Sequence, residues 1–220
     1  MIQTKILMSN AAMSNEESIL GEIHKAEKNI AIYEREIPEL IPEIRELMKN
    51  TVKLELNGTL SEIKKAIITQ FKDHFPTFKA LPKDILELLN LFNNVAGSST
   101  YRLLLATVNT NMCRRFHTDI NDLRLLCTYS GPGTLWLTED NINRNALDSD
   151  DEEKCIAIDQ EQIQQAKTGD AIILKGAIYP KADTKAIVHR SPTIEESGKT
   201  RLLLRIDTND FLSFLNGDDN

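Results

Sequence analysis

The stretch LRLLCTYSGPGTLWL, residues 123–137, decides the fold class of this chain. Two runs rich in apolar, aromatic and β-branched residues flank Gly131-Pro132-Gly133. This tripeptide is typical of a tight turn, because glycine adopts positive φ without strain and proline restricts its own φ. The stretch therefore predicts two β-strands joined by a turn.

The rest of the chain after residue 100 has the same texture of short apolar or alternating runs, bounded by Gly, Pro, Asn and Asp. These runs predict about eight strands, a number that suits a double-stranded β-helix, the jelly roll of cupin-like proteins. We expect the acidic segment of residues 141–154 to be a mobile loop. The strands are predicted at residues 101–109, 114–119, 123–130, 134–137, 155–159, 171–175, 186–191 and 201–207.

Residues 14–95 are patterned as helices instead. The signals are a Ser-x-x-Glu capping box, prolines suited to a helix start, and apolar stripes at helical spacing. The helices are expected to begin at Ser14, to run over about residues 39–49, and to follow Gly58 and Pro82.

We therefore predict an α+β fold, with N-terminal helices packed on a C-terminal double-stranded β-helix of the jelly-roll, cupin-like kind. The expected domains are a helical region over residues 1–97 and a metal-binding β-domain over residues 98–215. A chain of 220 residues is long enough to bury a sizeable core.

Composition narrows the classes of function. The net charge of −7 argues against a nucleic-acid partner, which requires a concentrated basic face. No apolar run approaches the roughly 18 residues of a membrane span, and the N-terminus has no pattern of a secretory signal. Three cysteines without paired spacing argue against a disulfide framework. We predict a cytoplasmic protein with no membrane partner.

A His-x-Asp motif and a distant histidine suggest a mononuclear metal site. His117 and Asp119 are two residues apart, so on a β-strand both side chains would point to the same face. His189 would arrive from another strand. Two imidazoles and one carboxylate on one side of an ion leave the other side open, as in non-haem Fe(II) oxygenases.

Two other interpretations of these residues remain open. The histidine and the carboxylate could form a structural hydrogen bond on a half-exposed sheet. Cys113 and His117 could instead form a closed zinc site with Cys127 or Cys155, because zinc prefers four nitrogen and sulfur ligands. The second interpretation leaves the Asp119 and His189 pattern without a role.

Several motifs resemble one bacterial family, called domain of unknown function 1826. The resemblance is strong over about residues 80–207 and weak before them. It implies kinship, but no activity that can be transferred to this chain. The motifs are MCRRFHTD (residues 112–119), RLLCTYSGPGTLWL (124–137), LKG (174–176), VHRSP (188–192) and RLLL (201–204).

A looser similarity is to the Fe(II)- and 2-oxoglutarate-dependent dioxygenases of the cupin-like fold. It implies His117, Asp119 and His189 as iron ligands. It also implies a basic residue after the last histidine that binds the far carboxylate of 2-oxoglutarate, for which Arg201 is the first choice and Arg205 the second. Residues expected to line this pocket from the surrounding strands are Tyr129, Trp136 and Lys175.

The leading hypothesis is an Fe(II)- and 2-oxoglutarate-dependent oxygenase-like protein that acts on an unknown substrate with a small-molecule cosubstrate. One alternative is a non-catalytic cupin-like protein that binds zinc or another divalent ion through the same ligands. Another is an interaction protein whose helical part docks a partner.

Overall fold

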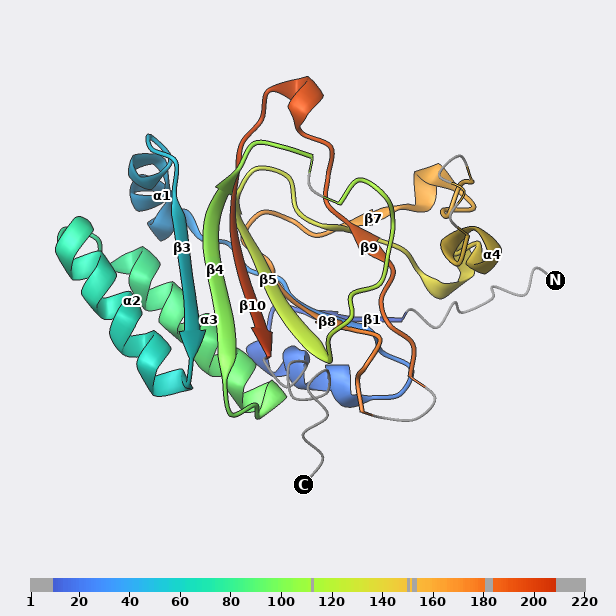
Figure 1. Ribbon diagram of the computed structural model, residues 1–220, viewed down its shortest axis with the longest axis horizontal. Coiled ribbons are helices and arrows are strands. Elements are labelled where there is room, and N and C mark those ends of the chain that lie inside the picture. Colours follow the sequence, from blue (N-terminus) through green and yellow to red (C-terminus); the bar gives the residue numbers. More distant parts are fainter. Residues whose placement is uncertain (1–9, 112, 150, 152–153, 181–183, 209–220) are drawn as a thin grey trace.

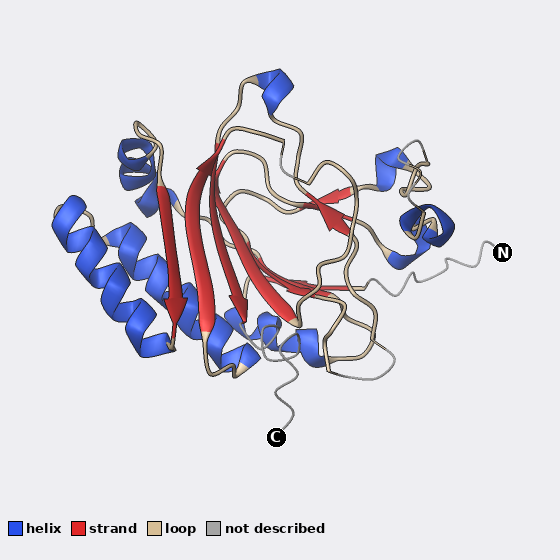
Figure 2. Ribbon diagram, in the orientation of Figure 1, coloured by secondary structure: helices blue, strands red, loops and turns tan. Residues whose placement is uncertain are grey.

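The computed structural model describes residues 10–111, 113–149, 151, 154–180 and 184–208. They form a mixed α+β protein with two β-sheets, as Figures 1 and 2 show. The large sheet has seven strands in the order β1-β2-β8-β5-β10-β4-β3, and the small sheet has three in the order β7-β6-β9. The α+β class predicted from the sequence is confirmed.

The large sheet is made of β1 (Ala11–Ser14), β2 (Ile30–Tyr33), β3 (Lys53–Gly58), β4 (Tyr101–Val108), β5 (Leu123–Ser130), β8 (Ala171–Lys175) and β10 (Arg201–Thr208). The small sheet is made of β6 (Leu135–Trp136), β7 (Gln164–Gln165) and β9 (His189–Arg190). The α-helices are α1 (Ile41–Leu47), α2 (Leu60–His74), α3 (Ala80–Ala96) and α4 (Arg144–Leu147). Short 3-10 helices span Glu17–His24, Pro38–Leu40, Glu139–Asn141, Gln160–Gln162 and Glu195–Ser197.

Helices α1, α2 and α3 cover one face of the large sheet, and the small sheet lies over the other (Figure 1). Alternation along β10 shows how the sequence produces these layers. Leu202, Leu204 and Ile206 are buried in the core that the sheet shares with the helices. Successive side chains of a strand point to opposite faces, so Arg201 and Arg205 face the small sheet. In agreement with this shared orientation, both arginines line one cavity between the two sheets.

Two of the predicted helices form as expected. Thr59 and Glu62 make a capping box at the start of α2, with Thr59 N–H donating to Glu62 Oε2 at 2.8 Å. Gly97, with a φ of 63°, ends α3 in the left-handed conformation that glycine adopts without strain. None of the helices within the described residues is long and apolar enough to cross a membrane.

The prediction of a helix from Ser14 is wrong. This segment forms strand β1, a 3-10 helix and strand β2, and the two strands pair in parallel. Ile30, Ala31 and Ile32 are all buried. A strand buried on both faces has a continuous apolar run, whose periodicity does not distinguish it from a buried helix.

The first 97 residues also supply β3, at the opposite edge of the large sheet from β1. Three strands of one sheet therefore come from the region predicted to be helical. The region is therefore only partly helical: it contains α1, α2 and α3 together with three strands of the large sheet.

The eight-stranded jelly roll is not confirmed. β5 and β8 have the predicted bounds, but the predicted strands at residues 114–119 and 155–159 are reduced to isolated bridges, His117↔His189 and Ile142↔Ala157. In the first of these segments, the carbonyl of Arg115 bonds the ring of His117 rather than a neighbouring strand. Each ladder is therefore interrupted after one residue pair.

The acidic segment of residues 141–154 is only partly a loop. Helix α4 lies inside it, and the side chain of Asn143 accepts the N–H of Ala146 as a helix cap. Residues 150, 152 and 153 of this predicted loop, and residues 209–215 of the predicted β-domain, lie outside the described residues.

We expect Glu43→Ala to destabilise the protein by about 1 kcal/mol near pH 7, the typical cost of losing a helix cap. Glu43 accepts the N–H groups of Lys79, Ala80 and Leu81 at 2.7, 3.1 and 2.7 Å, and so caps α3 from another helix. Partial burial raises the pKa of Glu43, but these donors outweigh burial and lower the pKa below its ordinary value of 4.5.

A carboxylate whose pKa is lowered by folding stabilises the protein fully above its unfolded pKa, and less as the pH falls through the folded pKa. The difference between wild type and Glu43→Ala should therefore shrink as the pH falls below the ordinary carboxyl value of 4.5, as measured by urea unfolding at several pH values. Glu39→Ala, at an exposed position, is the control. A difference that grows on acidification would contradict the assignment.

Candidate metal centre

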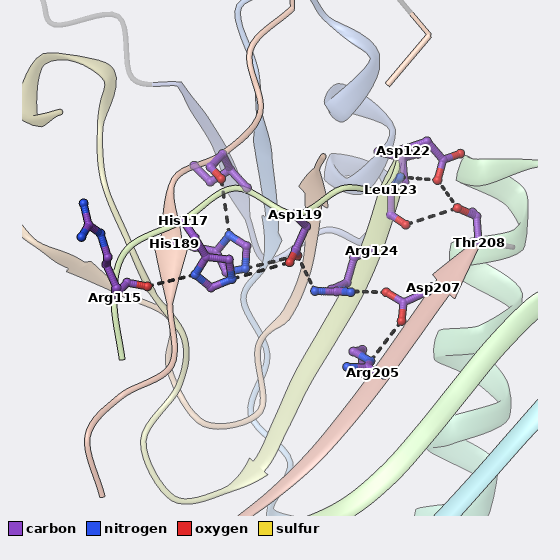
Figure 3. Close-up of polar contacts among 11 residues, drawn as sticks. Arg115, His117, Asp119, Asp122, Leu123, Arg124, His189, Arg205, Asp207 and Thr208 are labelled. Carbon is purple, nitrogen blue, oxygen red and sulfur yellow. Dashed lines mark hydrogen bonds and ion pairs between the residues drawn. The ribbon is translucent and has the colours of Figure 1, made fainter. Parts of the chain in front are cut away.

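Three side chains with metal-ligating atoms converge between the two sheets, as Figure 3 shows. His117 and His189 face each other across an isolated antiparallel bridge, in which each backbone N–H donates to the other residue's carbonyl at 3.0 Å. The two ring centroids are 4.7 Å apart. The bridge therefore fixes both imidazoles next to each other.

Asp119 is held on the same side by the loop that follows His117. The carbonyl of Asp119 accepts the N–H of Ala177 at 2.8 Å, and the N–H of Gly176 donates to Asp122 at 2.8 Å. Asp119 Oδ1 lies 3.6 Å from His117 Nε2, and Asp119 Oδ2 lies 3.3 Å from His189 Nε2. The structure therefore brings together the three residues that the sequence argument selected.

The donor set fits a divalent metal ion. One ligand atom from each residue lies within 4.8 Å of the others. Two ligand atoms at right angles around an ion with bonds of about 2.0–2.1 Å are about 3 Å apart, close to the two nitrogen–oxygen distances here. His117 Nδ1 lies 2.9 Å from the carbonyl of Arg115, which can only accept, so Nδ1 carries a proton and Nε2, which faces Asp119, is the nitrogen that would bind a metal ion in its deprotonated form.

Arg124 adds to the interactions that keep Asp119 of the cluster ionised. It forms ion pairs with Asp119 and with Asp207 on β10 (Figure 3). Burial raises the pKa of Asp119, but the contacts with His117 and His189 and the charge of Arg124 outweigh burial and hold this pKa well below its usual range. Asp119 is therefore ionised, the form that binds a metal ion.

Arg201 is a buried cation without an acidic partner among the described residues. The residue is 1% exposed, one terminal nitrogen donates to Thr128 Oγ1 at 3.0 Å, and Nε makes no hydrogen bond. Burial lowers the pKa of Arg201 to about 10. Arg201 lines the same cavity of about 70 Å³ as the three candidate ligands. A buried guanidinium that has no acidic partner among the described residues favours the binding of an anion, which would compensate its charge.

Three residues expected to line the pocket point elsewhere. Tyr129 lies on the helical side of the sheet, where its hydroxyl donates to Asp84 at 2.6 Å. Lys175 donates to the carbonyl of Lys25 at 2.8 Å, and Trp136 packs in the apolar core between the sheets. Tyr129 is therefore not brought to the cluster. Side chains alternate along β5, so Tyr129 points to the face of the sheet opposite to that of Arg124 and Thr128.

The sequence argument missed Arg124, Asp207 and Thr128. Each lies on a strand that the sequence predicted, and alternation along β5 places Arg124 and Thr128 on the face of the cluster. The available signal was three polar residues of equal parity in a largely apolar strand, Arg124, Thr128 and Ser130. Their partners depend on strand pairing, which the sequence did not provide.

The alternative zinc site with Cys127 is wrong. Cys127 is buried on the helical side of the sheet, and burial raises the pKa of its thiol to about 12. Cys155 is exposed, and Cys113 lines the small cavity. Among the described residues, a single group of three histidine, cysteine or acidic side chains could hold an ion: His117, Asp119 and His189.

We expect Gly176→Ala to weaken metal binding at the cluster and to destabilise the fold by about 1–3 kcal/mol, the usual effect of overpacking. A Cβ at Gly176 would lie 2.0 Å from the backbone oxygen of Asn121, in the loop that carries Asp119. Calorimetric titration with Zn²⁺ and urea unfolding would measure both effects. Gly21→Ala is the matched control, because a Cβ there meets nothing within 4 Å. Equal metal affinity in both variants would show that this loop does not position Asp119.

The fold and the cluster define an α+β protein with a candidate mononuclear metal centre between two sheets. The chain belongs to the family described as Protein of unknown function (DUF1826), which it matches over residues 14–207. The resemblance seen in the sequence motifs is thereby confirmed, and it extends through the N-terminal region. No curated protein matches the chain significantly.

Among solved structures, the chain is similar to a full-length Neurospora crassa protein in complex with alpha-KG. The TM-score is 0.44, with 13% identity over 88% of this chain and 77% of that chain. It is also similar to a Pseudomonas putida prolyl-4-hydroxylase, with a TM-score of 0.43 and 9% identity over 87% of this chain and 96% of that chain. Scores at this level carry no conclusion about the function of this chain.

Proposed function

We propose that this chain is an Fe(II)- and 2-oxoglutarate-dependent oxygenase-like protein. One observation carries the proposal: a His-Asp-His cluster and a buried arginine without an acidic partner among the described residues line one cavity. In this proposal the large sheet and the small sheet that faces it are the two halves of an irregular double-stranded β-helix.

The ligands would be His117, Asp119 and His189, which leave the remaining coordination positions to small molecules. When bound, Fe(II) would supply dioxygen activation coupled to oxidation of the 2-oxo acid. Asp119 offers one oxygen to the ion, because Arg124 holds the other side of the carboxylate. The hydrogen bond from His117 Nδ1 to Arg115 keeps that ring in the orientation a ligand needs.

Arg201 would bind the far carboxylate of 2-oxoglutarate. A guanidinium offers a planar pair of donors matched to a carboxylate, and burial strengthens the interaction by excluding water. Arg205 is the weaker candidate, because its guanidinium already pairs with Asp207 at 3.0 Å. The cavity at the cluster has a volume of about 70 Å³. It adjoins a second cavity of about 520 Å³, and Arg124 and Arg205 line both.

Anaerobic titration tests this proposal. Wild-type protein with Fe(II) and 2-oxoglutarate should show a weak visible charge-transfer band, and Arg201→Gln should weaken 2-oxoglutarate binding by about tenfold or more, the loss of one charge-assisted pair. Arg205→Gln should retain most of the 2-oxoglutarate affinity. Absence of both the band and calorimetric binding of 2-oxoglutarate in wild-type protein would reject the oxygenase.

A non-catalytic zinc protein is the second candidate, and one observation favours it. Cys113 lines the cavity that also contains His117, Asp119 and His189, and zinc accepts cysteine as well as histidine and carboxylate ligands. Tight Zn²⁺ binding that Cys113→Ser weakens, together with no binding of 2-oxoglutarate, would favour this candidate over the oxygenase.

A further inference from the structure

The larger cavity, of about 520 Å³, is lined by Arg124, which also contacts Asp119 of the metal cluster. Arg124 and Arg205 line both this cavity and the small one that contains the cluster. Sites for small molecules typically enclose about 300–1,000 Å³, so this cavity has the size of a ligand site. It lies next to the candidate metal centre without containing any of its three ligands.

The floor of the cavity is a polar row across four adjacent strands. Cross-strand partners share a face of the sheet. From β3 to β5, the row is Asn57, Arg102, Asp207 and Arg124. A chain neighbour of each of these four residues has its side chain on the opposite face of the sheet. These neighbours form an apolar row that packs on the helical side: Leu56, Leu103, Ile206 and Leu125.

The lining of the cavity has an excess of positive charge. Among the lining residues, three arginines, Arg102, Arg124 and Arg205, stand against two acids, Glu55 and Asp207, and Arg124 also pairs with Asp119 of the cluster. The chain as a whole has a net charge of −7, so this excess is local. A cavity with this charge favours an anionic ligand over a neutral or cationic one.

Arg205 has donors to offer such a ligand. Its Nε lies 3.0 Å from Asp207, in a contact that does not meet the geometry of a hydrogen bond. Figure 3 shows the guanidinium of Arg205 with Asp207 as its drawn partner, and its terminal nitrogens make no side-chain contact with other described residues. A guanidinium with free terminal nitrogens can bind a carboxylate or phosphate through two parallel hydrogen bonds.

An ordinary solvent-facing side of an antiparallel sheet is also polar, so polarity alone would not indicate a site. Here the side chains of Arg205, Asp207 and Arg124 are only 23%, 12% and 19% exposed. Charged groups at this depth lose much of their hydration, and a surface that needs only solubility does not bury them.

We infer that the 520 Å³ cavity binds a small molecule that carries a carboxylate or phosphate group, with Arg205 as the main partner and Arg102 as the second. That this molecule is the substrate rests on the proposed oxygenase function, since it would lie beside the metal cluster. The binding of an anion does not depend on that function.

Benzoate and benzamide test the inference, because they have nearly the same shape and differ in charge. Saturation-transfer difference NMR on the metal-free full chain should detect benzoate at about 10 mM and give an affinity about tenfold or more above that of benzamide. Phenyl phosphate forms a second arm, which distinguishes a phosphate site from a carboxylate site.

Arg205→Gln should weaken binding of the preferred anion by about tenfold, and Arg102→Gln by less, because Arg102 also pairs with Glu55. The exposed Arg45→Gln is the control and should leave this binding unchanged, and Arg201→Gln separates binding of the anion at the metal cluster from binding in the larger cavity. Equal binding of benzoate and benzamide, no binding of either anion, or a loss caused by Arg201→Gln alone would overturn the inference. Because no metal or 2-oxoglutarate is added, these outcomes are distinct from a failure of the oxygenase proposal.

Discussion

His189→Ala is expected to lower the affinity for a divalent metal ion by about a hundredfold or more. Loss of residues that merely support a ligand already reduces affinity by about 10–100-fold, so loss of a ligand should do at least as much. His189 is the most buried of the three candidate ligands, and its Nε2 faces Asp119 at 3.3 Å. Its removal would leave one imidazole and one carboxylate, too few to hold an ion tightly.

Calorimetric titration with Co²⁺, together with the visible absorption of the bound ion, would measure this loss. His74→Ala is the control, because His74 is exposed on α2 and should leave metal affinity unchanged. Thermal unfolding without metal would check that His189→Ala still folds. Wild-type affinity in a folded His189→Ala protein would mean that the ion binds elsewhere.

Asp84→Ala is expected to lower the free energy of unfolding by about 3–5 kcal/mol, the usual result of removing one partner from a buried ion pair. Asp84 lies on α3 and accepts from Arg35 at 2.7 and 3.0 Å and from the hydroxyl of Tyr129 at 2.6 Å. These contacts connect the helical layer to the large sheet. The substitution would leave the buried guanidinium of Arg35 without its acidic partner.

Urea unfolding would measure the loss. Glu87→Ala on the same helix is the control, because its exposed pair with Lys83 should contribute only about 0.3–0.5 kcal/mol. Asp84→Asn keeps the shape of the side chain, and its loss in free energy of unfolding should lie between those of Asp84→Ala and Glu87→Ala. A loss below about 1 kcal/mol in Asp84→Ala would show that the ion pair does not stabilise the contact between helix and sheet.

Strand patterns could be predicted well where a strand meets different surroundings on its two faces. The predicted strand at residues 201–207 corresponds to β10, and β5 was found with its bounds. The N-terminal strands could not be predicted in this way. β2 is buried on both faces and has no alternation to detect, whereas β3 does alternate but lies between segments patterned as helices.

The candidate ligands could be selected from the sequence, whereas their surroundings could not. His117 and Asp119 are near in sequence, and His189 was connected to them by the chemistry of a metal site. Arg124 has no such signal, because its partners Asp119 and Asp207 meet it only after β5 pairs with β10. Tyr129 was misplaced for a related reason, since the sequence does not say which parity of β5 faces the cluster.

The sequence by itself determined the family, most of the strands after residue 100 and the three residues that could hold an ion, because local periodicity and residue chemistry depend on near neighbours. Only the tertiary structure decided that the first strands join the same sheet, that Arg201 is buried without an acid among the described residues, and that a polar row lines a second cavity. The physical reason is that alternation assigns side chains to two faces, whereas long-range strand pairing and burial decide what each face meets.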